Sequence, residues 1–381
     1  MTGALECFVV ALRLGLTSFG GPVAHVGFFR EEYVERRKWL SEERFGELTA
    51  LSQFIPGPGS SQLGAAVGHE RAGFAGGVAA WLGFTLPSAL VMLFVAIGVE
   101  SLSSGVIHGM KLVAIAVVAG AWLGMRSSLA TGFRKGGIAL LALVVLSLSP
   151  AAWMTIVVIS FCALLGVFFL SAGALPVQEK KSRSMGGVIA MMVFFSLLFW
   201  SLSFSGKSDA HALAGIYRAG ALVFGGGHVV LPMLQETMVD GGYMSKEVFL
   251  GGYGATQAVP GPVFTFASFL GGQTELFGNA WLGAGAGIIA VFLPGMLLLA
   301  GTMSVWGKFR GKAWAQKAVQ GANAAVVGVL GLALIQMATN GSIAGFKDAI
   351  AVVLVFFILK KKLIPVWGLV IGAGAVGGVL L

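Results

Sequence analysis

Long apolar stretches follow one another along most of the chain, and short segments between them carry the charged residues. Four of these stretches lie at residues 75–99, 110–124, 151–173 and 186–204. Each reaches or approaches the roughly 20 residues with which an α-helix crosses a hydrocarbon core about 30 Å thick. Apolar and polar residues do not alternate along them, so they are unlike the strands of a membrane barrel. The pattern predicts an all-α polytopic membrane protein.

The composition supports this prediction. Of the 381 residues, 57% are hydrophobic and only 11% are charged, which leaves too little polar surface to cover a water-soluble globule. The lipid bilayer is therefore the expected partner of much of the surface. The net charge of +9 fits the retention of Lys and Arg on the cytoplasmic side of a membrane, and no nucleic acid is needed to explain it.

Sequence patterns of catalytic and metal sites are absent. The chain has no phosphate-binding loop followed by lysine, no cysteine and histidine cluster with metal-ligand spacing, and no nucleophile beside a base. Cys7 and Cys162 stand far apart in apolar surroundings and are expected to be packing residues. Near the N-terminus, Glu6 and Arg13 stand where a cleavable signal peptide would have a basic start and an apolar run. We expect no enzyme activity, no cofactor and no metal.

The chain contains two copies of one unit. The sequence motif RLGLTSFGGP begins at Arg13, and the similar motif RAGALVFGGG begins at Arg218, 205 residues later. The words QFIPGP and QAVPGP recur at a shift of 204 residues. Farther on, GFTLPS and AVFLPG place Pro87 over Pro294. An internal repeat of this length organises the whole chain into two related halves.

The repeated words resemble those of the chromate ion transporter family, in its long form with two homologous halves. The resemblance rests on FGGPVAH, QFIPGP, FGGGHVVLP and QAVPGP, and it covers essentially the whole chain apart from a linker. It implies an N-terminal repeat at 1–173, a linker with a connecting transmembrane helix at 174–208, and a C-terminal repeat at 209–381. It also implies a secondary transporter in the bacterial inner (plasma) membrane that exports chromate and gives chromate resistance.

The distribution of basic residues predicts that the two repeats have opposite orientations. The loop at 30–44 carries Arg30, Arg36, Arg37, Lys38 and Arg44, whereas its copy at 236–247 has only Lys246 as a basic residue. Basic residues favour the cytoplasmic side, so the first loop is expected inside and its copy outside. Inverted repeats are a common design for secondary transporters.

Two ways of counting the membrane crossings agree with this inversion. In the favoured count, each half begins with re-entrant broken-helix hairpins and then crosses about four times, and the segment at 187–205 crosses once between the halves. This count places every basic cluster on one side. In the rival count, residues 4–24 cross fully and 187–205 do not. The crossings of the favoured count lie near 74–99, 106–125, 136–149, 151–172, 279–305, 316–338, 347–359 and 365–381.

The two Pro-Gly-Pro words are the strongest candidates for a binding site. A proline removes a backbone donor and clashes with the preceding turn, so each word ends one helix and starts another. Broken backbone at membrane depth is tolerated only where protein or a watery cavity satisfies its polar groups. The segment after each break begins with free N–H groups and the positive end of a helix dipole, which suit an anion.

The remaining candidates are polar or flexible residues of the same repeated words. Arg13 and Arg218 are interpreted as counter-ions, and glycines, glutamines and hydroxyls as ligand donors. His25 stands six residues after Phe19 but His228 stands four after Phe224, so the two histidines need not share a role. The expected substrate-binding set is Arg13, Gly20, Gly21, His25, Gln53, Pro56, Gly57, Pro58, Ser60, Ser61, Arg218, Gly225, Gly226, His228, Gln257, Pro260, Gly261, Pro262 and Thr265.

Other interpretations stay open at this stage. Small residues let transmembrane helices pack closely, so part of the pattern formed by the 58 glycines is explained by packing alone. Sulfate has the shape and charge of chromate and is a natural alternative substrate. An anion channel would use the same hairpins as a selectivity filter, and a membrane scaffold would transport nothing. The sequence also leaves a homodimer open.

The inverted arrangement makes a prediction about topology. Residues near 36–38 and 360–362 should be cytoplasmic, and residues near 240–246 should be external, because the basic loops stay inside. Single cysteines at 38 and 243, labelled in intact cells with a membrane-impermeant reagent, measure this. Labelling of both positions from the same side would rule out the inverted repeat.

Overall fold

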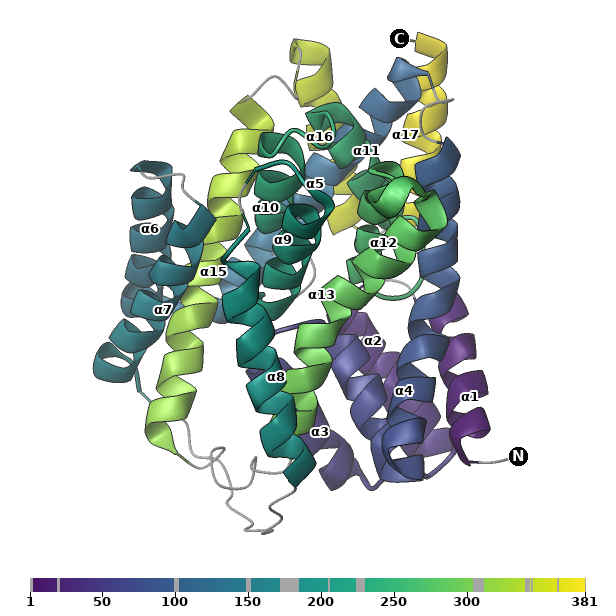
Figure 1. The fold of residues 1–381 in the computed structure, drawn as a ribbon. Helices are drawn as coiled ribbons and strands as arrows, with labels where there is room; N and C mark the ends of the chain where they lie inside the picture. The colour runs from purple at the N-terminus through teal and green to yellow at the C-terminus, as the bar shows by residue number, and fades with distance from the viewer. Residues whose placement is uncertain are drawn as a thin grey trace.

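The computed structural model describes residues 3–18, 21–98, 103–148, 152–171, 185–204, 206–223, 230–303, 312–339, 343, 345–361 and 363–380. All regular elements in these ranges are helices, which confirms the predicted all-α class. The chain begins and ends at opposite ends of the bundle (Figure 1).

The described residues of the first half form eight helical elements. They are α1 (Gly3–Thr17), α2 (Gly21–Arg30), the π-helix η1 (Glu31–Arg36), α3 (Glu42–Phe54), α4 (Gly59–Gly98), α5 (Ser104–Leu129), α6 (Gly132–Leu148) and α7 (Ala152–Phe169). Helix α8 (Met185–Ser201) then leads to the second half.

The second half has the same order of helices, but several separate elements take the place of the single long helix α4. It contains α9 (Asp209–Leu222), α10 (Val230–Gln235), the π-helix η3 (Glu236–Asp240), α11 (Lys246–Thr256), η4 (Val263–Thr265), α12 (Phe266–Gln273), η5 (Leu276–Gly278), α13 (Ala280–Met303), α15 (Ala313–Thr339), α16 (Phe346–Lys360) and α17 (Val366–Leu380).

Local details recur between the halves as well. In the first half α2 continues into the π-helix η1, and in the second half α10 continues into the π-helix η3. Both α3 and α11 begin at a serine N-cap. The Ser41 hydroxyl accepts the Arg44 N–H at 3.2 Å, and the Ser245 hydroxyl accepts the Val248 N–H at 3.3 Å. A capping hydroxyl satisfies one of the free N–H groups of a helix start, so the repeated sequence produces a repeated local structure.

Helix α4 is two helical arms that run in opposite directions. The backbone is non-helical at Ala72 and Gly73, and Gly73 has a positive φ of 64°, which favours glycine. The arms, 59–71 and 74–98, touch where Gly68 faces Gly76. A methyl group on Gly68 would lie 2.3 Å from the Gly76 carbonyl oxygen. Small residues thus let the two arms approach backbone to backbone.

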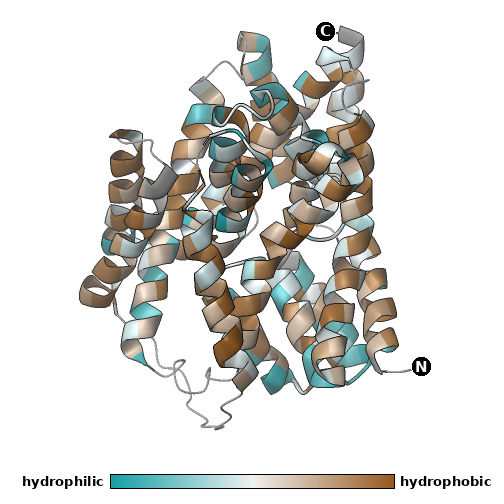
Figure 2. Ribbon diagram, in the orientation of Figure 1, coloured by the Kyte–Doolittle hydropathy of each residue, from teal (hydrophilic) through white to brown (hydrophobic). Residues whose placement is uncertain are grey.

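Several helices are suited to cross a bilayer. Among the described residues, four helices are long and apolar enough, and they lie at Gly59–Gly98, which includes the turn of α4, and at Ser104–Ser127, Ala280–Met303 and Ala313–Thr339. Shorter apolar helices lie at Val157–Phe169, Met185–Ser201 and Val366–Gly378. Apolar residues cover much of the length of α6, α7, α8 and α13 (Figure 2). The protein is therefore a multi-pass membrane protein.

The two halves are interlocked rather than side by side. Helix α15 of the second half packs against α6 and α7, and α5 of the first half packs against α16 and α17 (Figure 1). The Trp122 indole N–H in α5 donates to the Val327 carbonyl in α15 at 3.1 Å. Gly166 of α7 and Gly321 of α15 meet so closely that a methyl group on either would lie 2.9 Å from the other's Cα. Each half therefore supplies part of the packing of the other.

An ion-pair network ties the basic loop at 30–44 to its neighbours. Arg37 contacts Glu32 at 2.7 Å and Glu6 of α1 at 3.5 Å, and Arg71 contacts Glu6 at 3.0 Å. Both guanidinium groups also lie over the Trp39 ring. Burial alone would raise the pKa of Glu32, but the hydrogen bond from Arg37 and the charge of Arg36 lower it below its ordinary value. This loop is fixed to α1 and to the turn of α4.

The close approach of the α4 arms makes a prediction about stability. Gly68→Ala should lower the free energy of unfolding by about 1–3 kcal/mol, because the added methyl meets a backbone oxygen that cannot move alone. Thermal unfolding of the purified protein measures the loss. Gly124→Ala in α5 is the matched control, since nothing lies within 4 Å of its added methyl. Equal stability of Gly68→Ala and wild type would contradict the described contact.

Candidate functional site

Both Pro-Gly-Pro words interrupt the helices where the sequence predicts. The first lies between the end of α3 at Phe54 and the start of α4 at Gly59, and the second lies between the end of α11 and η4. The central glycines have positive φ angles, 124° at Gly57 and 97° at Gly261. Side chains other than glycine rarely adopt this conformation, so the glycine of each word is required by the turn itself.

Each break is held by the opposite half of the chain. The Gly57 N–H donates to the Val223 carbonyl at 2.8 Å, and the Gly261 N–H donates to the Ser18 carbonyl at 2.9 Å. Val223 and Ser18 are equivalent positions at the ends of α9 and α1. The two hydrogen bonds therefore form a reciprocal pair across the interface between the halves. They satisfy backbone groups that the broken helices leave open.

Each break also packs against the proline-containing helix of the opposite half. A methyl group on Gly57 would lie 3.0 Å from the Cα of Gly295, next to Pro294 in α13. A methyl group on Gly261 would lie 2.9 Å from the Ser88 hydroxyl, next to Pro87 in α4. The first break thus contacts α13 beside Pro294, and the second break contacts α4 beside Pro87.

Side-chain amides and hydroxyls strengthen these contacts. The Gln62 Nε2 group donates to the Gly295 carbonyl at 2.9 Å and to the Pro56 carbonyl at 3.0 Å. On the other side, the Ser268 hydroxyl donates to the Ala89 carbonyl at 2.7 Å. Gln62 thus fixes the first break to α13, and Ser268 fixes α12 to α4.

Several buried polar side-chain atoms around the two breaks have no hydrogen-bond partner among the described residues. They are Ser18 Oγ, both ring nitrogens of His25, Ser61 Oγ, Gln62 Oε1 and Thr85 Oγ1. The same is true of Gln257 Nε2 near the second break. Buried polar groups are normally paired, so these unpaired ones make the surroundings of the breaks the candidate site for a polar ligand.

The sequence predicted only some of these residues. His25, Ser61 and Gln257 belong to the expected set, whereas Ser18, Gln62 and Thr85 do not. Ser18 and Thr85 lie inside the repeated words SFGG and FTLP, so their position was visible. Their polarity was not informative by itself, because serine and threonine also pack between transmembrane helices.

The expected counter-ions lie away from this group. Arg13 is exposed on α1, and Arg218 donates from α9 to the Ser201 carbonyl at the end of α8. The two glutamines also differ, because Gln53 is exposed while Gln257 is half-buried. Equivalent positions in the repeat therefore do not have equivalent surroundings.

The other expected residues surround the two breaks or lie outside the described ranges. Ser60 is buried at the start of α4, and the Thr265 hydroxyl donates to the Pro262 carbonyl at 2.8 Å. Gly21 begins α2. Pro56, Pro58 and Pro260 flank the glycines of the breaks. Gly20, Gly225, Gly226 and His228 lie outside the described residues.

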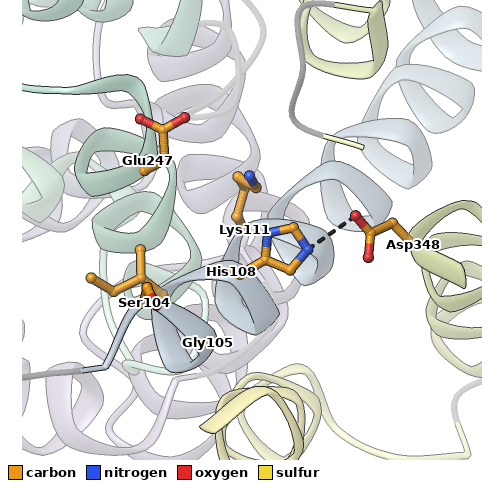
Figure 3. A pocket seen from close by; sticks show the side chains of 7 residues that line it. Ser104, Gly105, His108, Lys111, Glu247 and Asp348 are labelled. Carbon is orange, nitrogen blue, oxygen red and sulfur yellow. Dashed lines mark hydrogen bonds and ion pairs between the residues drawn. The ribbon is translucent and has the colours of Figure 1, made fainter. Parts of the chain in front are cut away.

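A second polar place lies between α5, α11 and α16 (Figure 3). It is a pocket of about 380 Å³ lined by Ser104, Gly105, Ile107, His108, Lys111, Glu247 and Asp348. His108 Nε2 lies 3.0 Å from Asp348 Oδ2. The pocket contains none of the expected site residues. Its two carboxylates make it poorly suited to a doubly charged anion.

Most of the unpaired side-chain groups around the breaks can donate hydrogen bonds. They are the hydroxyls of Ser18, Ser61 and Thr85 and the imidazole of His25, whereas Gln62 Oε1 is an acceptor. The described residues contain no group of three or more His, Cys, Asp or Glu that could hold a metal ion.

Comparison with known proteins identifies several similar transport proteins. A chromate transport protein of Cupriavidus metallidurans is 27% identical over 389 residues, covering 96% of this chain and 90% of its own length. A chromate transport protein of Pseudomonas aeruginosa is 28% identical, covering 76% of this chain and 70% of its own. An uncharacterised transporter of Methanocaldococcus jannaschii is 26% identical, covering 80% and 76%. No solved structure matches the chain significantly.

The family comparison covers both halves. The family model described as "Chromate transporter" matches residues 5–167 and 210–379. These two regions agree with the repeat found in the sequence and leave α8 between them. With this match over most of its length, the chain belongs to the chromate transporter family.

Proposed function

We propose that this protein is a secondary transporter of a tetrahedral oxyanion, chromate in the first place, which it exports across the bacterial inner membrane. The observation that carries the proposal is the reciprocal pair of hydrogen bonds, from Gly57 to Val223 and from Gly261 to Ser18. They bring two broken helices to one interface, where helix starts can face a common ligand. The relatives named as chromate transport proteins support chromate, and sulfate is the alternative of the same shape and charge.

The proposed architecture is an inverted repeat. In each half, the Pro-Gly-Pro word joins two arms of a re-entrant hairpin, α3 with the first arm of α4 and α11 with α12. The apolar helices that follow cross the membrane, and α8 crosses once between the halves. Reciprocal contacts between equivalent positions support this arrangement, because a two-fold relation between the halves produces every contact twice.

The direction of transport follows from charge. Moving a doubly charged anion out of a cell whose interior is negative is favourable by ~2.3 kcal/mol per charge for every 100 mV. Export of chromate therefore needs no coupling to another ion, and the resulting loss of chromate from the cell would give resistance. Import would need a coupled ion to offset the same energy.

The experiment that tests the function is anion flux in proteoliposomes. The purified protein is reconstituted, and uptake of chromate, sulfate, phosphate and chloride is compared with that of protein-free vesicles. Saturable flux of chromate or sulfate, with one competing for the other, is the expected result. A single-channel current would favour an anion channel, and no flux of any anion would leave only a scaffold.

The breaks generate a prediction about affinity. Pro58→Ala and Pro262→Ala should each weaken binding of chromate about tenfold, because a helix that continues through the break caps the N–H groups that would face the anion. Binding is measured by equilibrium dialysis at matched amounts of monodisperse protein. Pro365→Ala, an exposed proline before α17, is the control. Wild-type affinity in both site variants would assign the breaks to helix packing.

A further inference from the structure

Two buried aromatic rings of the first half lie close to several of the unpaired polar side chains. Phe29 of α2 and Phe84 of the second arm of α4 are buried, with ring centroids 5.1 Å apart in an edge-to-face arrangement. Gly64 of the first arm of α4 completes this aromatic layer, because a methyl group on it would lie 3.5 Å from the Phe29 ring. Three segments of the first half thus meet at one level.

Beside this layer, each of the same segments carries a polar side chain without a hydrogen-bond partner among the described residues. His25 precedes Phe29 by four residues, and its ring lies 5.3 Å from that of Phe84. Ser61 precedes Gly64 by three residues. Residues spaced by three or four lie on the same face of a helix, so His25 and Ser61 share a face with the layer. Thr85 directly follows Phe84, so its side chain lies on the neighbouring face of α4.

The end of α1 adds a fourth group at the same level. A methyl group on Gly15 would lie 2.6 Å from the Phe84 carbonyl oxygen, so α1 touches α4 beside the aromatic layer. Ser18 follows Gly15 by three residues, and its carbonyl accepts the Gly261 N–H at 2.9 Å. Its hydroxyl is buried without a partner among the described residues. The four side chains therefore surround the meeting point of the two halves.

Leaving these groups unpaired is energetically costly. Each buried polar group without a partner costs about 1–3 kcal/mol, and Ser18, His25, Ser61 and Thr85 are all at most 2% exposed. These four groups lack a partner among the described residues, while neighbouring groups such as Gln62 Nε2 and Ser88 Oγ are bonded. A ligand that accepts hydrogen bonds would satisfy them.

The equivalent positions of the second half are not arranged in this way. Ser18, His25 and Thr85 correspond to Val223, Val230 and Phe292, which are buried and apolar. Ser61 corresponds to Thr265, whose hydroxyl is already bonded to the Pro262 carbonyl. At these four described positions, the repeat therefore duplicates the breaks but not the unpaired polar side chains. A site with equal contributions from both halves would need polar groups at both sets of positions.

We infer that the oxyanion site is one-sided: Ser18, His25, Ser61 and Thr85 of the first half hold the anion, and the second half contributes the Gly261 break and the apolar side chains of Val223, Val230 and Phe292. This inference rests on the proposed transport function and assigns its binding residues. Three hydroxyls, one imidazole N–H and the N–H groups at the start of α4 are neutral donors, which match the four acceptor oxygens of chromate or sulfate. Neither Arg13 nor Arg218 belongs to the site.

The test compares substitutions of buried hydroxyls that lack a hydrogen-bond partner among the described residues with the substitution of one that has a partner. Thr85→Val keeps the shape of the side chain, and Ser18→Ala removes little volume. Each should raise the dissociation constants of chromate and sulfate about tenfold, since each removes a hydrogen bond to a charged ligand. Binding is measured by equilibrium dialysis on purified protein, using radiolabelled sulfate and competition by chromate. Thr85→Ser, which keeps the hydroxyl, should bind within about threefold of wild type.

The matched control is Thr256→Val in α11. Thr256 is also buried, but its hydroxyl already donates to the Gly252 carbonyl at 2.9 Å. Its variant should keep the wild-type dissociation constants. Thr265→Val tests the one-sided arrangement directly, and its loss of affinity should be clearly smaller than that of Thr85→Val.

The outcomes separate this inference from the proposed function. Wild-type affinity in both Ser18→Ala and Thr85→Val, in protein that transports chromate or sulfate, overturns the site and leaves the function standing. Equal losses in Thr265→Val and Thr85→Val overturn the one-sided arrangement. Absence of oxyanion binding and flux in the wild-type protein overturns the proposed function itself.

Discussion

The fold depends on hydrogen bonds to the backbone groups that interrupted helices leave open in an apolar interior. Two Pro-Gly-Pro turns interrupt helices in the interior of an apolar bundle, and unpaired backbone groups there are costly. In each turn, the glycine N–H donates to a carbonyl group of the opposite half: Gly57 to Val223, and Gly261 to Ser18. Neither half can satisfy its own break in this way. This mutual requirement explains why the halves are interlocked and why the breaks lie at their interface.

Much of this architecture could be predicted from the sequence because the relevant signals are local. Apolar runs of sufficient length predict the helices, and a triplet with two prolines and a glycine predicts a break wherever it occurs. The repeated words predict that both features occur twice. The crosswise exchange of α5 and α15 between the halves could not be predicted, because it depends on contacts between residues about 200 positions apart. No periodic pattern in the sequence encodes such a contact.

The site was harder to predict than the fold because the repeat marks equivalent positions, not equivalent surroundings. Arg13 and Arg218 were expected to act alike, but one is exposed and the other is bonded to Ser201. Ser61 and Thr265 are chemically similar, but only Thr265 finds a partner within its own turn. Polarity becomes informative only when burial and partners are known. For this reason Ser18 and Thr85, which resemble packing residues in the sequence, are site residues in the structure-based inference.

The interlocked packing also limits how such a protein can expose a site to both sides of a membrane. Rocking the halves apart as rigid bodies would pull α15 away from α6 and α7, and α5 away from α16 and α17, which removes backbone contacts as close as that of Gly166 with Gly321. Displacing only the first break from the opposite half breaks fewer contacts. They include the Gly57 bond to Val223, the Gln62 bond to Gly295 and the close packing of Gly57 on Gly295. For the proposed transport, the packing therefore favours a local movement of one break over separation of the two halves.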